Sequence, residues 1–252
     1  MDSRIALITG ASRGLGQNGA LKLAKQGVDI ILTYHSQAEQ AQQVVAAIEA
    51  LGRKAVAIQL DTGNISEFEP FVAEVKQVLA THWQRDDFDF LVNNAGIGMD
   101  ASLTDASEAL FDRLCNIHFK GVFFLTQALA PLLRDGGRIL NVSTGLTRFA
   151  MPGKGVYAAM KGAIEVYTRY LAKELGSRGI RVNVLAPGAI ETDFGGGAVR
   201  DVEAINALVS ANTALGRAGL PDDIGGVMAS LLVGDTGWIQ GQRIEASGGM
   251  FL

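Results

Sequence analysis

The feature that most constrains this fold is the alternation of short apolar runs with longer helix-like segments along the chain. The runs are mostly apolar on both faces, which is typical of parallel strands buried between two layers of helices. This alternation predicts an α/β fold with a doubly wound parallel sheet and helices on both faces. About seven strands are expected, over residues 4–9, 29–34, 54–60, 88–93, 137–143, 180–186 and 242–247.

The intervening segments predict helices, of which the longest cover residues 105–133 and 155–176. No repeat, linker or low-complexity tract interrupts the pattern, and 252 residues with 48% hydrophobic content suffice for one core. We therefore expect a single domain over residues 1–252. The other helices are expected to follow the first strand and to cover about 36–51, 66–81, 200–213 and 221–233.

Composition excludes several classes of protein. A net charge of -4 without a basic run argues against a nucleic-acid partner. No signal peptide or apolar stretch of membrane-spanning length is evident, so we expect a cytoplasmic protein that does not bind membranes. Cys115 is the only cysteine and is expected to be a packed thiol, while His35, His82 and His118 are isolated from any acid or cysteine cluster. No metal site is expected.

A glycine-rich loop joins the first expected strand to the first helix. It reads TGASRGLG over 9–16, and its glycines are Gly10, Gly14 and Gly16. A dinucleotide site needs a tight turn, bare backbone beside the pyrophosphate and a helix N-terminus that points at the phosphates. The strand before this loop and the helix after it provide that context, so the loop predicts a Rossmann-type phosphate-binding site.

This loop and five further motifs resemble, in order, those of the single-domain short-chain dehydrogenase/reductase family. The family motif T-G-x-x-x-G-x-G matches the loop, and the others are Asp61, NNAG (93–96), YAAMK (157–161), PG (187–188) and GGM (248–250). The resemblance spans the chain and includes members of the 3-oxoacyl-(acyl-carrier-protein) reductase type. It implies that a nicotinamide dinucleotide is bound by Gly10, Ser12, Arg13, Gly14, Leu15, Gly16, Tyr34, Asp61, Asn94, Ala95, Gly96, Tyr157, Lys161, Pro187, Gly188, Ile190 and Thr192.

The end of the second strand predicts a preference for NADP(H) over NAD(H). An acid about 20 residues after the glycines would hold the ribose 2′-hydroxyl of NAD, but that position is Tyr34. No carboxylate stands between Asp29 and Glu39 to repel a 2′-phosphate. Arg13 within the loop can form a forked contact with such a phosphate, and the resemblance associates a base there with NADP.

A tyrosine and a lysine predict the chemistry. Tyr157 and Lys161 are four residues apart and share one helix face. Free tyrosine has a pKa of about 10, so a nearby cation must lower it before it can exchange protons near neutrality. The resemblance makes Tyr157 the proton donor to a carbonyl, with Lys161 as its cation and as a ligand of the nicotinamide ribose. It also assigns Asn116, in an apolar helical stretch, to a water-mediated proton path to the lysine.

Two adjacent hydroxyls compete for one catalytic role. Family members carry a serine about 13 residues before the tyrosine, which corresponds to Thr144 here, whereas Ser143 is 14 residues before it. The 28-residue spacing from Asn116 also fits Thr144. Because a strand alternates its faces, only one of the two can point at the carbonyl without a twist. We favour Thr144, which retains a hydroxyl donor, and keep Ser143 as the alternative.

The segment after the sixth strand is expected to cover the substrate. A lid is expected near 190–215, where Gly195, Gly196 and Gly197 supply flexibility. Pocket walls are expected from 96–99, 146–151 and the lid.

The resemblance implies a reversible NADPH-dependent reduction of a ketone or 3-oxoacyl carbonyl to an alcohol. The alternative is a protein that binds NADP(H) as a sensor or scaffold without catalysis. The resemblance further implies self-association through the helices over 105–133 and 155–176. We expect a homotetramer, or otherwise a homodimer.

Overall fold

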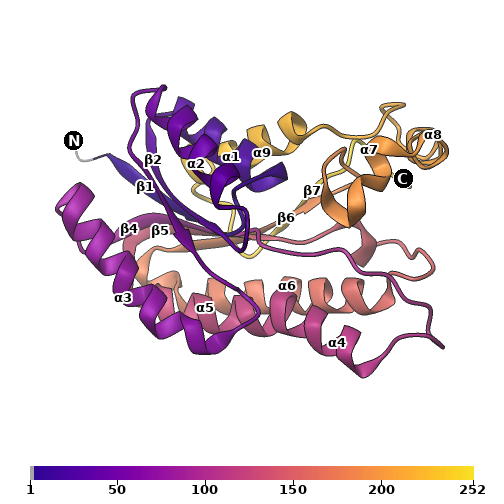
Figure 1. Ribbon diagram of the computed structural model, residues 1–252, viewed down its shortest axis with the longest axis horizontal. Helices are drawn as coiled ribbons and strands as arrows, with labels where there is room; N and C mark the ends of the chain where they lie inside the picture. Colours follow the sequence, from indigo (N-terminus) through magenta and orange to yellow (C-terminus); the bar gives the residue numbers. More distant parts are fainter. Residues whose placement is uncertain (1–2) are drawn as a thin grey trace.

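One seven-stranded sheet forms the centre of the computed structural model, which describes residues 3–252 (Figure 1). The strand order is β3-β2-β1-β4-β5-β6-β7, and all neighbouring pairs are parallel. The predicted fold class is confirmed. The strands are β1 (Arg4–Ile8), β2 (Val28–Tyr34), β3 (Ala55–Gln59), β4 (Phe88–Asn93), β5 (Leu133–Val142), β6 (Arg181–Pro187) and β7 (Arg243–Ala246).

Helices cover both faces of the sheet (Figure 1). Successive strand residues face opposite cores: Ile30 packs in one and Ile31 in the other, and both are fully buried. This double burial explains why the central strands are mostly apolar. One layer holds α1 (Gly14–Lys25), α2 (Ala38–Glu49) and α9 (Pro221–Val233), and the other holds α3 (Phe68–Val78), α5 (Gly121–Leu129) and α6 (Gly155–Glu174).

The helix predicted over 105–133 is not one regular helix. It consists of α4 (Glu108–Cys115), a π-helical turn η3 (Asn116–Lys120), α5 and a short 3-10 turn η4 (Ala130–Leu132). The backbone is tightly packed where η3 meets α5, since a Cβ at Gly121 would lie 2.0 Å from Thr62 O. A π-turn widens the helix and changes which side chains point inward, and such turns are frequent at functional sites.

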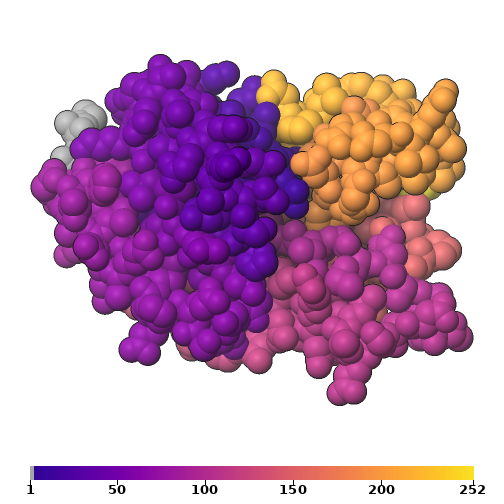
Figure 2. Space-filling view, in the orientation of Figure 1, coloured from indigo at the N-terminus to yellow at the C-terminus, as the bar shows by residue number. Residues whose placement is uncertain are grey.

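The segment after β6 lies beside the carboxyl ends of the strands. It contains a 3-10 turn η7 (Phe194–Gly197), α7 (Ala198–Asp201) and α8 (Glu203–Ala211). Its orange atoms form one end of the molecule, together with the magenta segment that follows β4 (Figure 2). Within residues 3–252, no helix has the length and apolar character needed to cross a membrane.

Candidate active site

The loop after β1 forms a cradle of bare backbone where the strand order reverses between β1 and β4. Gly10 has a φ of +63°, and a Cβ there would lie 2.8 Å from Ala95 Cα. A Cβ at Gly16 would lie 2.6 Å from Gly10 O. Both positions therefore require glycine. Because α1 begins at Gly14, its N-terminus opens at this loop, and the cradle fits a dinucleotide pyrophosphate.

Hydrogen bonds join this cradle to the turn after β4. Thr9 Oγ1 accepts hydrogen bonds from the backbone N–H groups of Asn94 and Ala95, each at 3.0 Å. The side-chain amide of Asn94 donates to Thr9 O at 2.9 Å and to Gly10 O at 3.0 Å. Two motifs predicted to bind the cofactor, about 85 residues apart in sequence, thus form one connected surface.

The residues predicted to distinguish NADP(H) lie beside the cradle. Arg13 extends into solvent, and its Nη1 is 3.9 Å from Asp193 Oδ2. Tyr34 ends β2 at the carboxyl edge of the sheet. Asp61 follows β3, and its Oδ2 is 3.8 Å from His35 Nε2. No carboxylate from β2 occupies this corner. Within residues 3–252, Arg13 makes only one long ion pair, so its guanidinium can turn toward a phosphate.

Tyr157 and Lys161 lie one turn apart on α6, and both are buried. Lys161 Nζ donates a 2.8 Å hydrogen bond to Val142 O and lies 5.9 Å from the centre of the Tyr157 ring. Burial lowers the pKa of Lys161 to about 8, so the ammonium form still predominates at pH 7. Burial raises the pKa of Tyr157 above its ordinary value, while a hydrogen bond from Thr144 acts in the lowering direction.

The two candidate hydroxyls have different partners. The Thr144 hydroxyl acts to lower the pKa of Tyr157 and accepts a 3.3 Å hydrogen bond from Leu146 N. The Ser143 hydroxyl donates a 2.7 Å hydrogen bond to Glu165 Oε1. The structure therefore brings Thr144 to the tyrosine and directs Ser143 away from it.

A histidine that the sequence had not assigned to the site lies against Tyr157. His118 is fully buried in η3, and its ring meets the Tyr157 ring edge-on with centroids 5.0 Å apart. Its Nε2 lies 2.8 Å from Ile97 O. Burial and the positive charge of Lys161 lower the pKa of His118 to about 3, so the imidazole is neutral at pH 7.

Asn116 stands at the start of the same π-turn, two residues before His118. Across residues 3–252, the Asn116 side chain makes no hydrogen bond to Tyr157 or Lys161. The signal that could have identified His118 is a polar ring within the apolar stretch "NIHFKGVFF". The regular period of a helix does not predict that His118 faces Tyr157, because the wider π-turn changes which residue points inward.

The segment predicted to form a lid, near 190–215, lies against Tyr157 and the turn after β4. The ring of Phe194 is 5.8 Å from the Tyr157 ring, and a Cβ at Gly98 would lie 3.0 Å from Gly195 Cα. Glycines Gly195, Gly196 and Gly197 all have positive φ values, which gives the lid a conformation that few other residues adopt.

The remaining predicted cofactor residues lead from β6 into this lid. Pro187 ends β6, and a Cβ at Gly188 would lie 2.9 Å from Ser247 Cα. Ile190 pairs with Gly219 in an isolated bridge. Thr192 is buried beside Gly14 of the cradle. Ser12 is buried and Leu15 packs on the core beneath the cradle, so these predicted residues lie around the cradle at the carboxyl edge of the sheet.

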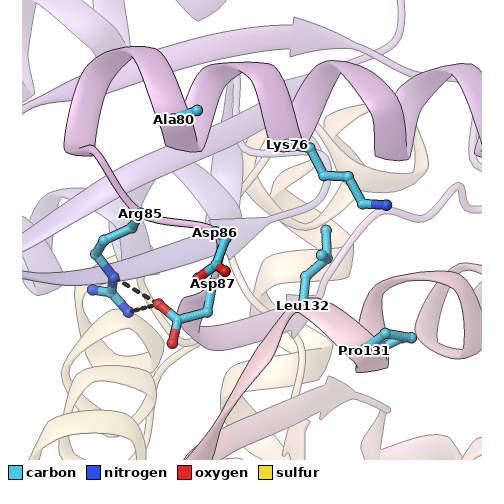
Figure 3. A pocket seen from close by; sticks show the side chains of 7 residues that line it. All are labelled: Lys76, Ala80, Arg85, Asp86, Asp87, Pro131 and Leu132. Carbon is cyan, nitrogen blue, oxygen red and sulfur yellow. Dashed lines mark hydrogen bonds and ion pairs between the residues drawn. The ribbon is translucent and has the colours of Figure 1, made fainter.

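A hollow in the surface lies at the amino ends of the strands, at the edge of the sheet opposite the cradle. Figure 3 shows its lining, in which Arg85 pairs with Asp87. Arg85 also donates to Asp89 at 2.9 Å, which ties this corner to the start of β4. None of the predicted site residues lines this hollow, so it is not the candidate active site. It is lined by Lys76, Ala80, Arg85, Asp86, Asp87, Pro131 and Leu132.

Comparison with known proteins places the chain in a family. A family profile described as enoyl-(acyl carrier protein) reductase matches residues 10–251. An uncharacterized oxidoreductase of Methylorubrum extorquens is 38% identical over 250 residues, which covers 99% of this chain and 98% of that protein. The chain belongs to the short-chain dehydrogenase/reductase family. It is an NAD(P)-dependent oxidoreductase of that family.

Two solved structures show the same fold. The promiscuous reductase LugOII, which catalyses keto-reduction at C1 during lugdunomycin biosynthesis, has a TM-score of 0.94 and 35% identity, with 99% of this chain and 98% of LugOII covered. The angucycline C-6 ketoreductase LanV with bound NADP has a TM-score of 0.93 and 34% identity, with 98% and 95% covered.

Proposed function

We propose that this protein is an NADPH-dependent ketoreductase with Tyr157 as its proton donor. The observation that carries the proposal is the meeting of Tyr157, Lys161 and Thr144 at the sheet edge that also bears the glycine cradle. The similarity to LugOII and LanV supports carbonyl reduction. Retention of both the tyrosine and the lysine disfavours the sensor or scaffold alternative.

Each site residue has a distinct task in this reaction. Bound NADPH would supply a hydride to the carbonyl carbon, which leaves negative charge on the carbonyl oxygen. Tyr157 donates its hydroxyl proton to that oxygen, and the Thr144 hydroxyl donates a hydrogen bond to it. The Lys161 ammonium, held by Val142 O, stabilises the tyrosinate that remains.

The test is NADPH oxidation with a panel of ketones. Tyr157→Phe is expected to reduce turnover by about 10²-fold or more, because it removes the proton donor. Tyr170→Phe is the matched control, since Tyr170 lies exposed on the same helix and should keep full activity. Wild-type turnover by Tyr157→Phe, or no turnover by wild-type protein with any ketone, would contradict the proposal.

His118 is proposed to take the place that the sequence assigned to Asn116. Its neutral ring contacts Tyr157 and the backbone of Ile97 after β4, and the Lys161 charge acts on it. His118 Nε2 lies 2.8 Å from Ile97 O and accepts a 3.3 Å hydrogen bond from Ile97 N, so the backbone of Ile97 holds the ring in place. His118 thereby supports the tyrosine ring edge-on.

A preference for NADP(H) over NAD(H) is proposed from Arg13 and Tyr34. The Arg13 guanidinium can exchange its 3.9 Å pairing with Asp193 for the 2′-phosphate. The bound NADP in LanV is consistent with this cofactor. Comparison of kcat/KM for NADPH and NADH tests the preference, and equal values would contradict it.

The apolar setting of Tyr157 favours a ring ketone as substrate. The residues packed around it include Ile97, Met99 and Leu146, and the Phe194 ring faces it from the lid. A flat hydrophobic ring gains more from these walls than a short linear 3-oxoacyl thioester does. We expect 1-tetralone to have a higher kcat/KM than an acetoacetyl thioester. The reverse ranking would favour a 3-oxoacyl thioester as the substrate instead.

Self-association as a homotetramer, with a homodimer as the alternative, is proposed through α5 and α6. These helices expose Phe124 and Val166 to solvent in the single chain, and a contact between copies would cover them. Sedimentation velocity tests this, and a monomer would contradict it. We further propose a cytoplasmic location, where NADPH is available to a reductase.

A further inference from the structure

A single carboxylate lies behind the candidate catalytic hydroxyl. Glu165 Oε1 is within 2.7 Å of Ser143 Oγ, 2.7 Å of Thr147 Oγ1 and 2.8 Å of Arg243 Nε. Ser143 and Thr147 flank Thr144 in sequence, so one carboxylate holds the segment on both sides of it. Glu165 itself is mostly buried, with 15% of its side chain exposed.

Arg243 on β7 joins the Glu165 carboxylate to the backbone of Thr144. Its Nη2 donates a 3.1 Å hydrogen bond to the backbone oxygen of Thr144. Its Nη1 donates a 2.8 Å hydrogen bond to Glu245 Oε2. The planar guanidinium therefore fixes three acceptors in one orientation, which a lysine could not reproduce.

We propose that Glu165 and Arg243 are positioning residues that hold Thr144 in register with Tyr157. Glu165 stands eight residues after Tyr157 and four after Lys161, on the same face of α6. One helix thus presents the tyrosine, its lysine and the carboxylate that holds the opposing segment. Glu165 also accepts the hydrogen bond of the Ser143 hydroxyl. Ser143 therefore does not compete as a donor, and Thr144 faces the reacting oxygen.

The inference rests on the proposed role of the Thr144 hydroxyl. A hydroxyl that donates to a carbonyl oxygen must keep its distance to within a fraction of an ångström, and an error of about 1 Å can cost about 10²-fold in rate. Thr144 lies just beyond β5, where strand pairing no longer fixes its backbone. The Glu165–Arg243 pair and the 2.8 Å bond from Lys161 to Val142 O replace that pairing.

A double-mutant cycle tests the proposal. Glu165→Gln removes the charge and places an amide among three donors, so kcat with NADPH and a ketone should fall by about tenfold or more while KM for NADPH changes little. In a Thr144→Val background, the same substitution should change kcat by less than about twofold, because the hydroxyl that it positions is absent. Glu174→Gln, on the exposed end of α6, is the matched control.

The positioning role of Glu165 and the proposed function of the protein can fail independently. A wild-type kcat for Glu165→Gln, or an equal loss in both backgrounds, overturns the positioning role and leaves the proposed function intact. A wild-type kcat for Thr144→Val overturns the role of Thr144 and the inference with it. If Glu165→Gln does not fold, Arg243→Lys enters the same cycle, since it retains the charge and loses the fork. The same two expectations then apply to it.

Discussion

Replacement of Thr144 by valine tests the choice between the two hydroxyls directly. Valine keeps the branched shape of threonine and removes the hydroxyl that acts on the pKa of Tyr157 and accepts from Leu146 N. Loss of a donor to a developing oxyanion typically costs about 10²–10³-fold in kcat, which corresponds to about 2.7–4 kcal/mol. The unmatched Leu146 N–H should add a loss of about 1 kcal/mol in the free energy of unfolding.

The pH profile gives a second readout for the same variant. The Thr144 hydroxyl acts to lower the pKa of Tyr157, so its removal should raise that pKa further. In the oxidation of an alcohol with NADP+, Tyr157 must be deprotonated to accept the proton. The rise of activity with pH should therefore move to higher pH in Thr144→Val.

The matched substitution is Ser143→Ala. It removes one hydrogen bond to Glu165 and should lower kcat by much less than Thr144→Val does. Steady-state turnover of both variants with NADPH and a ketone, alongside their thermal unfolding, makes the comparison. If Ser143→Ala abolished turnover and Thr144→Val did not, the assignment of the hydroxyls would be wrong.

Three further predictions concern the cofactor cradle and the buried ring. Arg13→Ala should raise KM for NADPH at least about tenfold and leave KM for NADH unchanged, and equal changes in both would refute a phosphate contact. Gly10→Ala should abolish NADPH binding in a fluorescence titration, because its Cβ would meet Ala95 Cα at 2.8 Å; Gly226→Ala, with open space around it, should bind normally. Because the pKa of His118 falls to about 3 on folding, stability should be full above about pH 6.5 and decline toward pH 3, by about 2 kcal/mol at pH 5. In denaturant melts, His118→Asn should flatten this decline, and an unchanged slope would show that another group causes it.

Local patterns were sufficient to predict the sheet and the cofactor cradle. Strands β1, β2, β4 and β6 are mostly apolar runs buried on both faces, so their positions follow from the sequence. The glycine loop requires only a strand before it, a helix after it and glycines where side chains would collide. The spacing of Tyr157 and Lys161 fixes their common face because α6 is a regular helix.

The helix over 105–133 shows where local pattern is insufficient. A regular 3.6-residue period predicts one orientation for Asn116, but the π-turn over Asn116–Lys120 brings His118 to Tyr157 instead. The turn is packed against the segment after β3, as the closeness of Gly121 to Thr62 O shows. Its position therefore depends on contacts about 60 residues away in sequence.

The sequence by itself determined the fold class, the loop glycines and the tyrosine–lysine pair. The fold class follows from the repeated apolar runs, and the other two depend on residues close together in sequence. Only the tertiary structure decided which hydroxyl meets Tyr157, which ring packs on it and which carboxylate lies behind Thr144. Arg243 reaches the Thr144 carbonyl across 99 residues, and Glu165 reaches Ser143 across 22. Such partners follow from how strands and helices pack side by side, which no spacing within a single element encodes.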